Sequence, residues 1–218
     1  GINYNPEDPN YDIFRKSCEV SAKRLFPNFS FIDAPFNLSF YKPGDYRTEV
    51  GYMGCRTRVM SDITDLNNQT TGGRGNLSFT SINLPRIAIK HGICLKERDK
   101  ADMDGFYKEL GETMELVRDQ LLERFEIQCN KRCYNFPFLV QQGVWTDGDK
   151  LKPTDRMRKI LKHGSLTLGF IGLAETLKAL IGEHHGQSEK AQKLGLEIIG
   201  FMRDKIDGFC KEYNLNFA

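Results

Sequence analysis

The chain has 218 residues, of which 39% are hydrophobic and 28% are charged, a composition that provides enough apolar side chains for a sizeable core. Its 31 basic and 29 acidic residues leave a formal net charge of +2, which is too small to favour a nucleic acid or an anionic membrane as partner. The sequence has neither a run of about 18 apolar residues nor an export signal, so we expect a soluble protein without a membrane segment.

The six cysteines are scattered along the chain, which favours a reducing cytoplasm over a disulfide-stapled secreted protein. We expect most of them to be buried apolar side chains. The sequence opens at Gly1 without a methionine and ends where an apolar strand is predicted to begin. We therefore interpret residues 1–218 as a single internal piece of one domain, incomplete at both ends.

The first half of the chain combines one helix with short strands and loops. Apolar residues recur at spacings of three and four from Tyr11 to Phe26, which predicts a packing helix that ends at Pro27. Short strands are predicted at 29–32 and 36–40, and a turn at 42–45. The glycine-rich segment from Val50 to Met60 is predicted to be a loop.

A polar segment, Asp62–Thr71, and a Gly72-Gly73-Arg74-Gly75 turn lead into a strand predicted at 76–84. Leu77, Phe79 and Leu84 fall near one parity of this strand, whereas Ser78 and Thr80 fall near the other. We therefore expect an apolar face and a polar face, with an irregularity before Pro85, and the polar face is a candidate pocket wall.

The second half alternates strands and helices, which predicts the α/β class. A long helix is predicted at 100–132, a strand at 135–142, and a basic helix from Pro153 to Lys162. A strand follows at 165–171, a helix at 173–181, and a last helix at 189–213. The apolar residues expected to be buried in the two long helices are Met103, Phe106, Leu110, Met114, Val117, Leu121, Phe125 and Cys129, followed by Leu196, Ile199, Met202, Ile206 and Phe209.

Three small motifs are candidates for a metal site or a phosphate site. Cys129 and Cys133 are four residues apart, but no second pair completes a zinc site, so incidental thiols are favoured. His184 and His185 lack a metal-binding pattern and are interpreted as hydrogen-bonding loop residues. The Gly72–Gly75 turn matches neither a Walker A loop nor a dinucleotide fingerprint, so it is weak support for a phosphate site.

Cys55 stands between glycines and close to Arg56 and Arg58 in the sequence, a setting typical of a reactive thiol. No histidine follows nearby as a general base, so a cysteine hydrolase would need His163, His184 or His185 to fold back onto it. By composition alone, a reactive thiol and a structural one remain equally good interpretations.

Five motifs in chain order favour a reactive role for Cys55 over a structural one. The sequences YMGCRTRV (52–59), GRGNLSF (73–79), YNFPF (134–138), GFIGLAE (169–175) and HHG (184–186) closely resemble consecutive landmarks of the anaerobic, class III, ribonucleoside-triphosphate reductases. The resemblance covers nearly the whole chain, and it implies a glycyl-radical enzyme with a ten-stranded α/β barrel, in which a finger loop carries the active cysteine to the centre.

The resemblance also implies roles for single residues. In the family the loop cysteine becomes a transient thiyl radical that removes the ribose 3′ hydrogen, and on the MGCRTRV match this residue is Cys55. Asn76 matches the active-site asparagine of GRGN, whose neutral amide can position the substrate by hydrogen bonds to ribose hydroxyls. The alternative is a purely structural role, in which Asn76 caps the Gly75 turn. Gly54 and Arg56 are interpreted as neighbours that shape the substrate site, and no role is derived for the histidine pair.

The function implied is the reduction of ribonucleoside triphosphates for DNA replication by an allosteric enzyme, with formate as reductant and a radical-SAM activating enzyme as partner. A homodimer is implied for the full-length protein. The glycyl-radical segment, the four-cysteine zinc site, the N-terminal second active-site cysteine and the regulatory cone of the family are absent from these residues, so we expect the chain alone to be inactive. Two alternatives stay open: a formate-lyase-like glycyl-radical enzyme, and a nucleotide-binding or structural module without radical chemistry.

Overall fold

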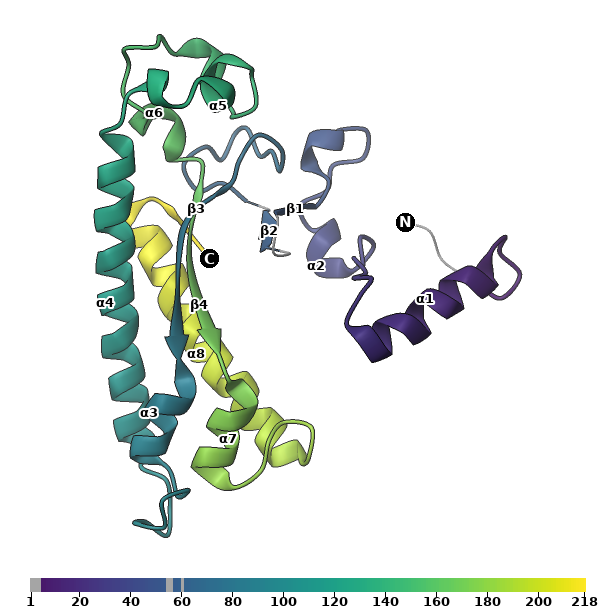
Figure 1. Cartoon of the computed structure of the whole chain (residues 1–218), viewed down its shortest axis with the longest axis vertical. Helices are drawn as coiled ribbons and strands as arrows, with labels where there is room; N and C mark the ends of the chain where they lie inside the picture. Colours follow the sequence, from purple (N-terminus) through teal and green to yellow (C-terminus); the bar gives the residue numbers. More distant parts are fainter. Residues whose placement is uncertain (1–4, 54–56, 60) are drawn as a thin grey trace. The chain divides into compact units, whose positions relative to one another are not determined.

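The structure is a computed structural model that describes residues 5–53, 57–59 and 61–218. The chain divides into two compact units, Gly1–Met60 and Ser61–Ala218, which are described separately (Figure 1). Within the described residues, no helix combines the length and apolar character needed to span a membrane.

The first unit begins with helix α1 (Tyr11–Arg24), which confirms the helix predicted there. The helix ends where Leu25 adopts a left-handed conformation with φ 59°, ahead of Pro27. None of its residues is buried, so the side chains of α1 form no core in this unit.

Three predictions for the first unit are wrong. Residues 29–32 form no strand, and the second predicted strand is instead the short helix α2 (Pro35–Leu38), because Pro35 occupies the first helical turn, where its fixed φ and missing N–H are tolerated. The segment predicted as a loop contains strands β1 (Gly51–Met53) and β2 (Thr57–Val59), which pair antiparallel. The 3₁₀ helix η1 (Tyr46–Thr48) precedes this hairpin, after the predicted turn at 42–45.

The second unit is built on a parallel three-stranded sheet in the order β3-β4-β5. The strands are β3 (Asn76–Asn83), β4 (Ser165–Ile171) and β5 (Asn216–Phe217), and the first two confirm the predicted strands. Helix α3 (Leu84–His91) follows β3, and helix α7 (Leu173–Ile181) follows β4. The mixed α/β class is therefore confirmed in the form of a small parallel sheet.

The two long helices are α4 (Met103–Cys129) and α8 (Glu189–Tyr213). Each starts at a side-chain cap: Asp102 accepts a hydrogen bond from the Gly105 N–H, and Ser188 accepts one from the Ala191 N–H. The apolar stripe predicted on α4 is buried along its length, except that Met103 is only half-buried. Helix α4 packs against β3 and β4, and α8 packs against α4, α7 and β5 (Figure 1).

The buried side of α8 differs in part from the prediction. Met202, Ile206 and Phe209 are buried as expected, but Leu196 is 69% exposed, Ile199 is only half-buried, and Ile198 is buried instead. The run Leu196–Ile199 contains three apolar residues that point in different directions around the helix, so the helical period alone does not select the one that faces the core.

The connection between α4 and β4 contains a third segment that was wrongly predicted to be a strand. The segment predicted as a strand at 135–142 is helix α5 (Pro137–Gln141), preceded by the 3₁₀ helix η2 (Cys133–Asn135). Pro137 again stands in the first helical turn, where it is favoured. The 3₁₀ helix η3 (Gly148–Lys150) and helix α6 (Arg158–Leu161) follow, so the predicted basic helix is shorter than expected.

One face of the sheet packs against α4. On the helix-facing side, Thr80 Oγ1 donates to Gln120 Oε1 of α4 over 2.7 Å, and Ile82, Leu166 and Leu168 are buried. On the opposite side Phe79 is 67% exposed. The predicted faces of β3 were therefore wrong, since the even-numbered residues face the core and Phe79 does not.

We call the side of the sheet that carries Phe79 the open face. It comprises the register pairs Phe79 with Thr167, Ser81 with Gly169 and Asn83 with Ile171.

Candidate functional site

The cysteine-bearing segment lies between β1 and β2. Gly54, Cys55 and Arg56 are outside the described residues, but the strands on both sides are held in place. On β2, Arg58 Nη1 donates to Asn37 Oδ1 over 2.7 Å, and its guanidinium lies 4.8 Å from the centre of the Phe36 ring. On β1, the Tyr52 hydroxyl shares a hydrogen bond of 2.7 Å with Ser30 Oγ. The hairpin is therefore fixed to the preceding segment through both of its strands.

Asn76 begins β3, where the pairing with β4 is irregular. Asn76 pairs with Ser165 and Ser78 pairs with Leu166, so Leu77 is an extra residue, a β-bulge. Paired residues of neighbouring parallel strands point to the same face, and alternation then puts Asn76 on the face of Ser165 and Thr167. Without the bulge, Asn76 would point to the side packed against α4. The bulge thus turns Asn76 to the open face.

The side chain of Leu77 packs against Gly164. A Cβ placed on Gly164 would come within 2.5 Å of Leu77 Cγ, so only a residue without a side chain fits opposite the bulge. The bulge is further held by Gln128 of α4, whose Nε2 donates to the Leu77 carbonyl over 3.1 Å. These contacts fix the start of β3 from both sides.

Two buried side-chain oxygens in the described residues have no hydrogen-bond partner: Asn76 Oδ1 and Thr167 Oγ1. A buried polar atom without a partner costs free energy, and in native proteins such atoms are usually completed by water, an ion or a ligand. The register places both residues on the open face, so the unmet hydrogen-bonding capacity is concentrated on one side of the sheet.

Below the start of β3 lies a buried polar cluster around Asp62, whose side chain is 2% exposed. One carboxylate oxygen lies 2.7 Å from His163 Nδ1, and the other accepts hydrogen bonds from Asn216 Nδ2 and from the Thr64 hydroxyl. Arg74 Nε lies 3.8 Å from the same carboxylate. We call Asp62, Arg74, His163 and Asn216 the Asp62 cluster.

Arg74 connects this cluster to the GRGN segment. Its guanidinium donates to the carbonyl oxygens of His163, Thr70 and Ser61 at 2.7 to 3.0 Å. One residue later, the Gly75 carbonyl accepts a hydrogen bond from Ser165 N–H over 2.9 Å. The backbone that leads to Asn76 is therefore tied to the backbone that leads into β4.

The electrostatics of the cluster follow from burial and pairing. Burial of Asp62 opposes ionisation, but the hydrogen bonds from Asn216, Thr64 and His163 and the charge of Arg74 outweigh it, so the pKa of Asp62 lies below its ordinary value of 3.8. Burial lowers the pKa of Arg74, an effect that the nearby Asp62 carboxylate opposes. The two residues form a buried ion pair.

Sequence reasoning missed the Asp62 cluster. Its members are separated by as many as 154 residues, and no local pattern connects them. The available signal was the position of Arg74, a charged residue directly before a strand in a glycine turn. Such a residue is either exposed or paired with a buried carboxylate, and the sequence alone does not choose between these.

The cysteine and histidine pairs lie apart from Asn76 in the sequence, and their surroundings differ. Burial raises the pKa of Cys129 to about 11 and also raises that of Cys133, so both are neutral thiols at neutral pH. Across residues 5–53, 57–59 and 61–218, no group of three or more His, Cys, Asp and Glu side chains is arranged to hold a metal ion. His184 lies in the predicted loop, where its Nδ1 accepts a hydrogen bond from the Gly186 N–H over 3.0 Å.

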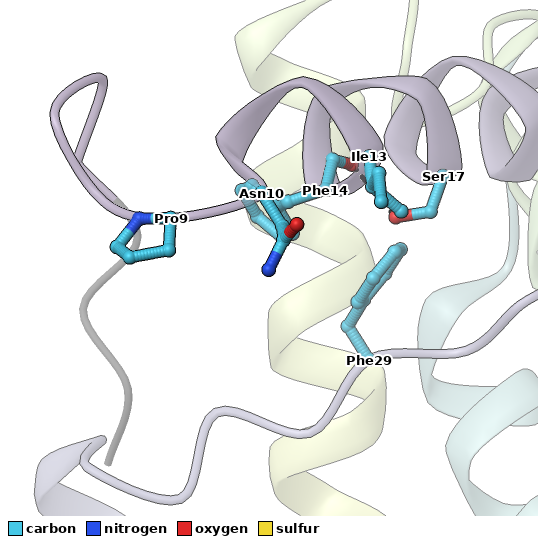
Figure 2. A pocket seen from close by; sticks show the side chains of 6 residues that line it. All are labelled: Pro9, Asn10, Ile13, Phe14, Ser17 and Phe29. Atoms are coloured by element: carbon cyan, nitrogen blue, oxygen red, sulfur yellow. Dashed lines mark hydrogen bonds between the residues drawn. The ribbon is translucent and has the colours of Figure 1, made fainter.

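A pocket of about 320 Å³ lies in the first unit, on the side of α1 (Figure 2). Phe14 and Phe29 meet edge to face there, with ring centres 5.9 Å apart. No charged side chain lines it, and none of the residues predicted for a site belongs to it. The lining consists of Pro9, Asn10, Ile13, Phe14, Ser17 and Phe29.

Comparison with known proteins identifies the family. The sequence model of a family described as anaerobic ribonucleoside-triphosphate reductase matches residues 1–218. Proteins of that name from Salmonella typhimurium and Escherichia coli are 32% and 31% identical to this chain over its whole length. The protein of that name from Enterobacteria phage T4 is 31% identical over 86% of this chain.

The chain spans 29% of the length of each of these relatives. The match is continuous, and it includes both the segment that carries Cys55 and the strand that starts at Asn76. This chain therefore belongs to the anaerobic ribonucleoside-triphosphate reductase family.

Proposed function

We propose that this chain is the cysteine-bearing part of the catalytic barrel of an enzyme that reduces ribonucleoside triphosphates to deoxyribonucleoside triphosphates. The observation that carries the proposal is the family match over residues 1–218, which spans the motifs of Cys55 and Asn76 in order. In this proposal both compact units belong to one catalytic domain. The parallel sheet of the second unit is a segment of a ten-stranded barrel, and the hairpin of β1 and β2 carries the finger loop.

Cys55 would act as the hydrogen-abstracting group. Its thiyl sulfur takes a hydrogen atom from C3′ of the ribose: the S–H bond forms, the C3′–H bond breaks, and the unpaired electron passes to the carbon. A glycyl radical on a residue outside this chain supplies the unpaired electron. Such a step requires the sulfur to be held close to one C–H bond and shielded from water, which suits a loop fixed at both strands.

Asn76 would hold the substrate. Its Oδ1 is buried and without a partner in the described residues, and a ribose hydroxyl is a donor that would complete it. A neutral amide keeps the same hydrogen-bonding groups at every physiological pH. Gly54 and Arg56 would shape the loop next to the substrate.

The rest of the system lies outside this chain in the proposal. Formate is the co-substrate that supplies the reducing equivalents, a radical-SAM enzyme activates the protein, and the full-length protein is a cytoplasmic homodimer with a separate four-cysteine zinc site. The 218-residue chain by itself would give no turnover, even with an activating enzyme and formate present.

The test is the substitution Cys55→Ser in the full-length protein, followed by an anaerobic assay of deoxynucleotide formation. We expect turnover to fall below detection, because a serine O–H bond is too strong to be replaced by the same hydrogen-atom exchange. Glycyl-radical formation, measured by electron paramagnetic resonance after activation, should remain. The matched control is Cys94→Ser, since Cys94 is an exposed free cysteine outside the motif.

Normal turnover in the Cys55→Ser protein would remove the thiyl assignment. An activated wild-type protein that reduces no ribonucleotide, but acts on another substrate, would favour the formate-lyase-like alternative. A protein that binds nucleotides and never acquires a radical would favour the non-catalytic alternative. An experimental structure of the full-length protein with Cys55 remote from Asn76 would also contradict the proposal.

A further inference from the structure

Thr167 is the second residue of the open face with an incomplete hydrogen bond. It lies in the middle of β4, and its hydroxyl oxygen is buried without a partner among the described residues. A threonine hydroxyl can both donate and accept, and inside a strand it normally finds a neighbouring polar group or a water molecule. Its isolation therefore calls for a partner outside the described residues.

The position of Thr167 relative to Asn76 follows from the register. Asn76 pairs with Ser165, and Thr167 lies two residues further along the same strand and on the same face. Neighbouring strands are about 4.8 Å apart, and two residues along a strand span about 6.6 Å, so the two Cα atoms are about 8 Å apart. Side chains that extend from such positions can reach two adjacent hydroxyl groups of one small molecule.

The residues next to this pair are small or apolar. Beyond Thr167 the next residue on the open face is Gly169, where an added Cβ would come within 2.8 Å of Ser81 Oγ. The Ser81 side chain therefore lies over Gly169, and the exposed Phe79 ring lies beside Thr167. A polar pair beside an apolar ring is the arrangement expected for a sugar that presents both hydroxyl groups and C–H bonds.

We propose that Thr167 is a substrate-binding residue whose hydroxyl, together with Asn76 Oδ1, contacts the sugar hydroxyls of the ribonucleotide. The inference rests on the proposed function, because it takes the ligand of the Asn76 site to be the substrate. It adds a contact from a second strand, so that the sugar is held by β3 and β4 at once. The bulge at Leu77 is what brings the two oxygens to one face.

The test compares Thr167→Val with Thr167→Ser in the full-length protein. Valine keeps the shape and removes the hydroxyl, so KM for cytidine triphosphate should rise about threefold to tenfold, the value of one hydrogen bond, while kcat changes little. Serine keeps the hydroxyl and should restore KM to near the wild-type value. The control is Thr113→Val on α4, where the hydroxyl donates to the Glu109 carbonyl, and this change should leave KM unaltered.

Binding without turnover gives a second measurement. Equilibrium dialysis of cytidine triphosphate against the Cys55→Ser protein, with and without Thr167→Val, should show a matching rise in Kd. If Thr167→Val does not fold, Thr167→Ala removes the same hydroxyl without a new methyl group and serves in both assays.

Unchanged KM and Kd in Thr167→Val, with a lower melting temperature, would overturn the inference and indicate that the hydroxyl binds a structural water. This result leaves the proposed function intact as long as wild type reduces ribonucleotides and Cys55→Ser does not. If the wild-type protein itself reduces no ribonucleotide, the result contradicts the proposed function rather than the role of Thr167.

Discussion

Asp62 and Arg74 bury opposite charges beneath the start of β3, with both side chains only 2% exposed. Removal of one partner leaves the other charge buried without compensation, which is far more costly than loss of an exposed ion pair. The cluster also receives hydrogen bonds from β5 through Asn216, so it joins the starts of all three parallel strands.

Replacement of Asp62 by asparagine should lower the free energy of unfolding by about 3–5 kcal/mol, because Arg74 and His163 lose their carboxylate. Urea denaturation followed by circular dichroism measures the change. Asp204→Asn, at an exposed position of α8, should stay within about 0.5 kcal/mol of wild type. A loss for Asp62→Asn as small as that of the control would contradict the buried ion pair.

The stabilisation by Asp62 should also depend on pH. Its pKa is lower in the folded state than the ordinary value of 3.8, so its contribution is fully present above 3.8 and is lost as the pH falls through the folded-state value. The stability difference between wild type and Asp62→Asn should therefore be constant near neutral pH and shrink below pH 3.8. Denaturation curves across that range measure it, and a difference independent of acid would contradict the lowered pKa.

At the scale of elements, α7 depends on two glycines with positive φ. Gly172 precedes the helix with φ 76°, and Gly182 follows it with φ 85°. They differ in their surroundings: a Cβ on Gly172 would lie 2.3 Å from Pro85 Cγ, whereas nothing lies within 4 Å of a Cβ on Gly182.

Alanine at each of these positions separates backbone strain from crowding. Gly182→Ala should cost about 1–2 kcal/mol for the left-handed conformation alone. Gly172→Ala should cost about 1–3 kcal/mol more, because the new methyl group also displaces Pro85 at the start of α3. Thermal denaturation of the two variants gives the comparison, and equal losses would show that the contact with Pro85 relaxes freely.

At the scale of the whole molecule, the two compact units differ in how much they bury. All the buried hydrophobic residues in the described part, from Ile82 to Phe217, belong to the second unit. The first unit contributes buried polar residues, such as Asn37 and Thr48, but none of the residues of α1 is buried. Stability should therefore be concentrated in the second unit.

Hydrogen exchange measured by mass spectrometry tests this distribution. Amides of α1 should exchange much faster than those in the middle of α4 and α8, since opening of α1 exposes little apolar surface. Peptides from α3, a helix shorter than α1 but with Leu84 and Ala88 buried, serve as the control for helix length. Protection of α1 equal to that of α4 would contradict the expectation.

The sequence by itself determined the elements that carry a complete local signal. The helical period of α4, the strand at Ser165–Ile171 and the glycine break at Gly172 were all readable, because their apolar residues and their boundaries agree. The ordered motifs also identified the family and, within it, Cys55 and Asn76 as candidates. Short apolar segments before and after prolines were misread, since Pro35 and Pro137 start helices that the strand-like composition concealed.

Tertiary structure decided which way Asn76 points. One extra residue, Leu77, reverses the face to which Asn76 points at the start of β3. The Leu77 side chain packs against Gly164, which is distant in the sequence. The same two segments are joined by Arg74, which binds the His163 carbonyl over a separation of 89 residues. The same is true of the Asp62 cluster, whose charges become a site only when three strands start side by side. Such contacts depend on residues distant in the chain, which no local period can encode.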